Sequence, residues 1–306
     1  LSVGGHTVSF KEVAGWNTPQ DQSLPVLANQ TATASGTYVQ QTGALTVSLG
    51  PAAAVSAGAQ WRVDGGAWQN SGATVSGLSV GSHTVSFKEV AGWNTPQDQS
   101  VPVLANQTAT ASGTYLDVTP PTGSILINNN LSVTNNRNVT LNLNWSDAEG
   151  SGVVRMKFSN DGKTWTAWEP LAAAKLWTLP EGEGYHTVRV QYRDLSGNNS
   201  LVYNDFIRVD TIPPTGSILI NNGAVSTTNR NVSLKLAWAD GDGSGVVRMR
   251  FSIDGKTWTA WEPLKTPKGY TLPAETGKHY TVRVTYRDAG GNISAAFNDY
   301  IRLDAP

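Results

Sequence analysis

The sequence predicts an all-β protein built as a tandem array of small β-sandwich modules. Three observations support this fold class. Long stretches recur at fixed shifts, apolar and polar residues alternate with a period of two, and turn-forming residues recur every 8–12 positions or so. No segment keeps the three-and-four spacing of an amphipathic helix, so we expect no helix.

The first repeat covers the N-terminal third of the chain. Residues 1–38 return at 78–115, and only two positions differ: Gly5 against Ser82 and Leu24 against Val101. Only the second copy, which starts at about residue 43, contains the whole repeat unit. We therefore expect 1–39 to be the C-terminal part of a truncated module, 40–116 to be a complete module, and the chain to be a piece of a longer array.

A second type of repeat follows. PPTGSILINN at 120–129 returns at 213–222, and the stretch 138–171 returns at 231–264 with SGVVRM and DGKTWTAWEPL unchanged. The shift is 93 residues and becomes 94 from TVRVQYRD at 187–194 onward. These copies predict two further modules, 117–210 and 211–306.

The expected strands of the complete first-type module follow from its alternating segments. These segments are 45–50, 60–63, 83–90 and 107–115. Asp64, Gly65 and Gly66 come directly after the second segment. They predict a tight turn, because Gly and Asp tolerate the positive φ that such a turn requires.

Each second-type module is expected to be an immunoglobulin-like sandwich of two sheets. Its clearest strand alternates apolar with polar residues, and the apolar positions in the two copies are Val139, Leu141, Leu143, Trp145, Val232, Leu234, Leu236 and Trp238. Asp161-Gly162 and Asp254-Gly255 predict two-residue hairpin turns. About seven short strands in each copy fit such a sandwich, whose buried Trp is expected to pack on aliphatic side chains because the chain has no Cys.

Composition excludes several classes of function. The chain carries 22 Lys and Arg against 23 Asp and Glu, and only 15% of its residues are charged, so we expect no nucleic-acid partner. The absence of Cys removes disulfides and thiolate metal sites. No stretch reaches the roughly 18 consecutive apolar residues of a membrane helix, so no membrane span is expected.

The sequence carries no catalytic constellation. Its four histidines are His6, His83, His186 and His279. His6 and His83 share one repeat position and are expected to be half-exposed packing residues. His186 and His279 are expected on opposite strand faces, which is hard to reconcile with shared chemistry. With no nucleophile elbow, phosphate loop or metal-binding helix motif, we predict that the chain is not an enzyme and has no cofactor.

Two families are similar to these repeats. The unit with AQWRVDGGAWQ, GSHTVSFKEVAGW and ASGTY resembles PEGA-type β modules, and the unit with TPPTG, DGKTWTAWEP and YRD resembles bacterial immunoglobulin-like repeats. SNDGKTW and SIDGKTW also resemble Asp-box turns, which implies a structural role for Asp161 and Asp254. The resemblances imply a bacterial extracellular or cell-surface scaffold.

Aromatic residues provide the main alternative interpretation. Trp165 and Trp168 recur as Trp258 and Trp261, and a spacing of three would put the two rings of each pair on opposite strand faces. One ring of each pair is expected in the core. Trp168 and Trp261 are the candidate glycan contacts, unless Arg155 or Lys157 covers the outward ring with its stem.

Acidic residues are expected to converge where each linker enters a sandwich. The candidate metal ligands are Asp117, Asp147, Glu149, Asp194, Asp210, Asp240, Asp242 and Asp288. Oxygen-only ligands on loops suit calcium, so the sequence predicts an inter-module calcium site at each junction. The alternative is that these carboxylates only cap their own turns.

The combined hypothesis is a non-enzymatic extracellular structural protein: a stalk, filament or adhesin segment. Its linkers contain Pro120, Pro121, Pro213 and Pro214, and proline stiffens a joint by restricting φ. The expected partners are further modules of the same chain, other copies of it, or surface glycans. The alternative function is an array of glycan-binding modules that use exposed Trp.

Overall fold

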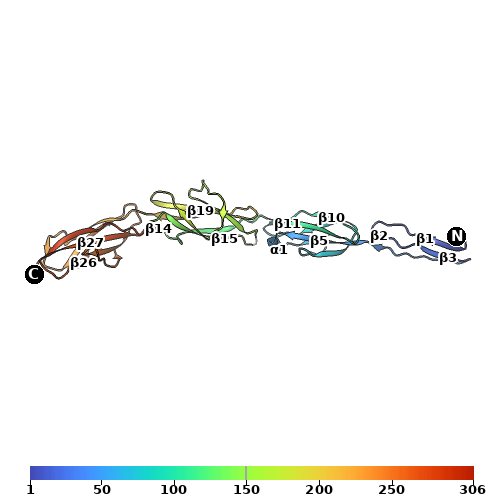
Figure 1. Ribbon diagram of the computed structural model, residues 1–306, viewed down its shortest axis with the longest axis horizontal. Coiled ribbons are helices and arrows are strands. Elements are labelled where there is room, and N and C mark those ends of the chain that lie inside the picture. Colours follow the sequence, from blue (N-terminus) through green and yellow to red (C-terminus); the bar gives the residue numbers. More distant parts are fainter. Residues whose placement is uncertain (149) are drawn as a thin grey trace. The chain divides into compact units, whose positions relative to one another are not determined.

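The computed structural model describes residues 1–148 and 150–306, and these residues form β-strands joined by turns and loops (Figure 1). The prediction of an all-β fold of tandem β-sandwich modules is confirmed. The expectation of no helix is wrong at one place, because Ala52–Ser56 form the short helix α1. Pro51 at its N-cap has a φ of −71°, and alanine has the highest helix propensity, so this run closes one turn.

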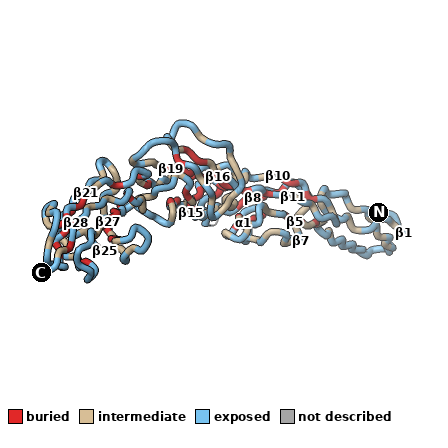
Figure 2. The backbone as a smooth tube through the Cα atoms, turned by 60° about the vertical axis from the view of Figure 1, so that its left-hand side comes forward, coloured by how far each residue is buried: buried red, intermediate tan, exposed pale blue. Residues whose placement is uncertain are grey.

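The N-terminal stretch contains four strands. They are β1 (Gly4–Val8), β2 (Trp16–Asn17), β3 (Gln22–Val26) and β4 (Val39–Gln40). β1 pairs with β3, and β2 pairs with β4, both antiparallel. Within 1–41, all of which the structure describes, no residue is buried (Figure 2). These strands therefore have no core of their own.

The next module contains the same strands together with partners that bury them. Besides α1, this module contains eight strands: β5 (Thr42–Gly50), β6 (Trp61–Val63), β7 (Thr74–Ser79), β8 (Gly81–Phe87), β9 (Trp93–Asn94), β10 (Gln99–Val103), β11 (Thr108–Thr114) and β12 (Leu116–Asp117). One sheet has the order β10-β8-β6 and another β11-β5-β7, with β11 parallel to β5. Leu45, Val47 and Trp61 pack between them against Val85 and Tyr115.

His83 in β8 differs from its expected half-exposed position. The side chain is buried, its Nδ1 lies 2.5 Å from Asp64 Oδ2, and its Nε2 lies 2.7 Å from the Ser79 carbonyl oxygen. The hydrogen bond between the two side chains raises the pKa of His83 and lowers the pKa of Asp64. Asp64 holds the expected turn, with positive φ at both Asp64 and Gly65. The histidine therefore ties this turn to the sheet.

The two later modules repeat one topology. The first contains β13 (Thr122–Ile127), β14 (Val133–Thr134), β15 (Asn138–Ser146), β16 (Val153–Ser159), β17 (Glu169–Pro170), β18 (Ala174–Thr178), β19 (Gly184–Asp194) and β20 (Tyr203–Val209). The second contains β21 (Thr215–Ile220), β22 (Ser226–Thr227), β23 (Asn231–Ala239), β24 (Val246–Ser252), β25 (Glu262–Pro263), β26 (Lys268–Thr271), β27 (Lys278–Asp288) and β28 (Phe297–Leu303). Each has a three-stranded sheet, β13-β15-β18 or β21-β23-β26, and a five-stranded sheet, β14-β20-β19-β16-β17 or β22-β28-β27-β24-β25.

The hairpin turns at Asp161 and Asp254 are longer than predicted. β16 and β17 pair antiparallel, but nine residues, 160–168, connect them. Gly162 has a positive φ of 75°, whereas Asp161 does not. Asp161 Oδ1 instead accepts hydrogen bonds from the backbone N–H groups of Lys163 and Thr164. The aspartate thus holds the start of a loop.

The sandwich cores are centred on tyrosine. Tyr192 and Tyr286 are fully buried, and their hydroxyls donate to the carbonyl oxygens of Ser124 and Ser217. Trp145 is only partly buried, and its ring centroid lies 6.0 Å from that of Tyr192. The expectation of a buried Trp packed on aliphatic side chains alone is therefore wrong.

The described residues divide into two compact units. The first comprises Leu1–Thr122, Ser146–Val154 and Arg193–Ser200, and the second comprises Gly123–Trp145, Arg155–Tyr192 and Leu201–Pro306. Within this described part of the chain, no helix is long and apolar enough to cross a membrane. Each of the two aspartate clusters considered next lies inside one unit.

Candidate functional site: two clusters of three aspartates

The structure brings three aspartates together at the start of each sandwich. In the first cluster, Asp117 ends β12, Asp147 follows β15 directly, and Asp194 is the last residue of β19. One carboxylate oxygen of each residue lies within 4.8 Å of the others. Strand ends thus deliver three side chains from distant parts of the sequence to one place.

The second cluster has the same construction. Asp210 follows β20, Asp240 follows β23, and Asp288 ends β27. Their oxygens also lie within 4.8 Å of one another. Six of the eight candidate ligands therefore form two equivalent groups.

The remaining two candidates do not join the clusters in the described structure. Glu149 lies outside the described residues. Asp242 is exposed and is not a member of its cluster; its backbone carbonyl oxygen accepts a hydrogen bond from Arg208. Asp242 as a calcium ligand therefore stays a prediction.

Backbone N–H groups hold most of the carboxylate oxygens in the first cluster. Asp117 accepts hydrogen bonds from the N–H groups of Thr119 (2.9 Å) and Ser151 (2.7 Å). Asp194 Oδ1 and Oδ2 accept from the backbone and side-chain nitrogens of Asn198, both at 2.8 Å. Both aspartates are almost fully buried. These bonds fix the positions of the two carboxylates.

The third carboxylate of each cluster is only half satisfied. Asp147 Oδ2 accepts from Gly152 N at 2.7 Å, and Asp240 Oδ2 accepts from Gly245 N at 2.6 Å. The other oxygen of each, Oδ1, is buried and has no hydrogen-bond partner among the described residues. Turn capping therefore accounts for only one oxygen of each of these residues.

One glycine lies close to the third aspartate of each cluster. A Cβ atom at Gly150 would lie 2.5 Å from Asp147 Oδ2, and one at Gly243 would lie 2.6 Å from Asp240 Cγ. A side chain at either position would therefore displace the aspartate carboxylate. The two glycines thus lie directly against the carboxylates of Asp147 and Asp240.

The electrostatics of the clusters follow from this burial. Burial raises the pKa of Asp147, and the charges of Asp117 and Asp194 raise it further, against the hydrogen bond from Gly152. Burial likewise raises the pKa of Asp240, and Asp210 and Asp288 add to the effect. Arg208 partly offsets it in the second cluster.

The tryptophan pairs are arranged differently from the expectation. Neither ring of either pair is fully buried. Lys157 Nζ lies 4.8 Å from the ring centroid of Trp165 and 4.7 Å from that of Trp168. The Arg250 guanidinium carbon lies 5.0 and 4.5 Å from the rings of Trp258 and Trp261. One cation therefore contacts both rings of each pair.

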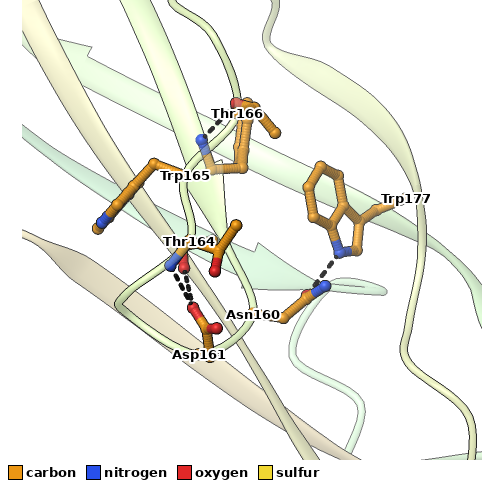
Figure 3. A pocket seen from close by; sticks show the side chains of 8 residues that line it. Asn160, Asp161, Thr164, Trp165, Thr166 and Trp177 are labelled. Atoms are coloured by element: carbon orange, nitrogen blue, oxygen red, sulfur yellow. Dashed lines mark hydrogen bonds between the residues drawn. The ribbon is translucent and has the colours of Figure 1, made fainter.

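A small hollow of about 280 Å³ adjoins Trp165 in the first sandwich (Figure 3). Trp177 and Asn160 also line it, and Trp177 Nε1 donates to Asn160 Oδ1 at 2.9 Å. Asp161 lies at its rim, where backbone N–H groups, that of Thr164 first, lower the pKa of its carboxyl. Trp177 and Asn160 were not candidates from the sequence, although Trp177 lies in the alternating strand β18.

Comparisons with known proteins identify no family for this chain. No family model matches the chain, and no curated protein matches it. Among solved structures, fibronectin(III)-like modules of Clostridium thermocellum CbhA give a TM-score of 0.38 at 15% identity, covering 59% of this chain and 94% of that one. The chicken CNTN1 FN1–FN3 domains give 0.35 at 12% identity, covering 80% and 88%. The Bacillus anthracis TIE protein gives 0.28 at 12% identity, covering 99% and 56%.

Proposed function

We propose that this chain is a non-enzymatic structural segment of a bacterial extracellular or cell-surface protein, a spacer built from rigidly joined β modules. The observation that carries the proposal is the hydrogen bonding of the linkers. A spacer keeps its reach only when its joints resist bending, so linker residues should be bound to the modules on both sides.

At the first joint, the linker is bonded to the preceding module and to the sandwich loops. Val118 N donates to the Gly92 carbonyl oxygen at 3.0 Å, and Leu116–Asp117 pair with β9. Asp117 accepts hydrogen bonds from Ser151 N through its side chain and from Asn198 Nδ2 through its carbonyl oxygen. The linker is thus hydrogen-bonded both to the preceding module and to the sandwich that follows it.

At the second joint, the pattern recurs with different partners. Thr211 N donates to the Glu183 carboxylate of the preceding sandwich at 2.9 Å, and the Thr211 hydroxyl donates to the same carboxylate. Asp210 is bound to the following sandwich by Ser244 N and Asn292 Nδ2. Two adjacent linker residues therefore face opposite neighbours, and this supports a stiff joint.

Solution scattering of the full chain is the test. We expect the scattering profile of a rod, because modules that are joined in series and have separate cores do not merge into one globule. Changing Pro213 and Pro214 to Gly together with Glu183→Gln should add bending at the second joint, whereas Pro273→Gly, in an exposed loop, should leave the profile unchanged. A wild-type profile of one compact globule would contradict the spacer.

A second candidate function is glycan binding at the hollow beside Trp165. Two indole rings and the polar groups of Asn160 and Thr164 line it, and such a combination of apolar faces and hydrogen-bonding groups suits a sugar ring. The corresponding positions of the second sandwich carry Ile253 and Tyr270. This candidate therefore assigns binding to the first sandwich.

Retention on a panel of immobilised polysaccharides tests this candidate. We expect Trp165→Ala to abolish retention with little change in melting temperature, since the ring is only partly buried. The double change Trp168→Ala and Trp261→Ala should keep retention, because Lys157 and Arg250 already contact those rings. Absence of wild-type retention, or full retention by Trp165→Ala, would reject the glycan function.

A further inference from the structure

We propose that each aspartate cluster binds one calcium ion, so that the chain carries two equivalent calcium sites at the bases of its two sandwiches. The inference goes beyond the spacer function, since it rests on the geometry of the clusters themselves. Its consequence for the spacer is that the ion would join the linker aspartate to two loops of the sandwich.

The first argument is uncompensated charge. Three carboxylates with oxygens within 4.8 Å repel one another, and burial of Asp117 and Asp194 strengthens the repulsion by excluding water. Their hydrogen-bond donors are neutral N–H groups. A divalent cation at the centre would turn this repulsion into attraction.

The second argument is the unpartnered oxygen. The described residues contain three buried side-chain nitrogen or oxygen atoms without a hydrogen-bond partner, and two of them are Asp147 Oδ1 and Asp240 Oδ1. Buried polar atoms are nearly always paired, because an unpaired one keeps the full cost of leaving water. Both orphan atoms belong to the carboxylates of the clusters, at equivalent positions of two modules. A metal ion would satisfy both in the same way.

The duplication is informative because the surrounding loops differ. The loop after Asp147 reads AEGSG and the loop after Asp240 reads GDGSG, while the turns after Asp194 and Asp288 read LSGN and AGGN. The three aspartates are kept in both copies. If each aspartate only capped its own turn, the three carboxylates would not have to meet in both modules.

The donor set selects the type of ion. The clusters offer only oxygen, from three separate segments, and neither contains a histidine. Hard cations prefer oxygen ligands, and calcium accepts six to eight of them in irregular geometry, whereas magnesium demands a near-ideal octahedron. Each carboxylate oxygen that already accepts one N–H bond keeps a second lone pair for the metal. Calcium therefore fits these preformed but irregular oxygens best.

The competing explanation is a proton in place of the ion. A proton on Asp147 Oδ1 would let that oxygen donate to Asp117 or Asp194, and the raised pKa of Asp147 is in the direction that this requires. The groups facing it are acidic in the first cluster, and Arg208 also faces the second. The two explanations differ in their response to calcium and to pH.

The test is isothermal titration of the chelator-stripped full chain with calcium chloride at pH 7.5. We expect two sites per chain, one in Asp147→Asn, and none in the double variant Asp147→Asn with Asp240→Asn. Glu181→Gln, which removes an exposed carboxylate, should keep two sites. Magnesium chloride should give a much weaker response, and an equal response would overturn the choice of calcium.

Melting curves give a second readout that does not depend on binding heat. Calcium should raise the wild-type melting temperature and chelator should lower it, since a ligand bound only to the folded state stabilises that state. In chelator, the double Asn variant should melt at or above the wild type, because two like charges fewer remain and the amide can donate to its neighbours. It should gain nothing from calcium.

The opposite results would overturn the proposal. No calcium isotherm, melting that chelator leaves unchanged, and a wild-type melting temperature that rises as pH falls from 7.5 to 5 would assign a proton to the clusters. A chain that scatters as a rod with and without chelator, and binds no calcium, would keep the spacer function while rejecting the metal sites. The two proposals can therefore fail separately.

Discussion

Trp93→Ala is expected to unfold the complete first-type module, while Trp16→Ala in the copy is expected to change stability little. The two residues occupy equivalent positions of nearly identical sequences. Trp93 is 6% exposed and belongs to the core, whereas Trp16 is 40% exposed. Truncating a buried Trp costs about 3–5 kcal/mol, which is a large part of the total stability of a module of this size.

Hydrogen exchange measured by mass spectrometry distinguishes the modules within the full chain. Peptides from β5 and β6 should lose protection in Trp93→Ala and keep it in Trp16→Ala, and peptides of both sandwiches should keep it in each. The differences Gly5/Ser82 and Leu24/Val101 give the corresponding peptides of the two copies distinct masses. Equal losses of protection in the two variants would contradict the proposed role of the core.

Gly216→Ala is expected to destabilise the last sandwich strongly. An added Cβ would lie 2.6 Å from the Ala237 carbonyl oxygen and 2.9 Å from Tyr286 Cδ2, and neither neighbour is free to move. Tyr286 is fully buried and its hydroxyl donates to the Ser217 carbonyl oxygen at 3.0 Å. Overpacking of this kind costs about 1–3 kcal/mol, and more where backbone must shift.

Differential scanning calorimetry tests this prediction against a matched control. Gly269→Ala, in β26 of the same sandwich, adds a methyl group where no atom lies within 4 Å, so we expect it to keep the transition temperature. Gly123→Ala should repeat the effect in the first sandwich, because Tyr192 and the Asn144 carbonyl oxygen crowd that position equally. An unchanged transition in Gly216→Ala would show that the ring can move aside.

The acidic clusters could be predicted from the sequence to a large extent. Asp117, Asp147 and Asp194 lie at strand ends, and the topology of a sandwich brings those ends to one pole. Asp242 is not part of its cluster, because a loop of several residues does not fix which of its side chains points inward. The sequence does not show which carboxylate oxygen lacks a hydrogen-bond partner. That depends on how closely Gly150 and Gly243 approach the aspartates, and no pattern in the sequence specifies this approach.

The tryptophan pairs could not be placed by periodicity. A spacing of three implies opposite faces only on a strand, whereas 160–168 form the connection between β16 and β17. Both rings therefore reach the same lysine, Lys157. Periodicity likewise does not show that His83 contacts Asp64, because this contact spans 19 residues of sequence and is made by the turn and the sheet together.

The repeats, the period-two strands and the all-β class can be predicted from the sequence alone, because strand formation depends on local alternation and turn chemistry. Which residues are buried depends instead on tertiary packing. Some side chains that are exposed or half-buried in 1–38, such as Trp16, are buried at the equivalent positions of 78–115, such as Trp93. The difference lies in Leu45, Val47 and Trp61, which pack against the second copy alone. Burial is a property of the partners that surround a residue, and those partners come from elsewhere in the chain.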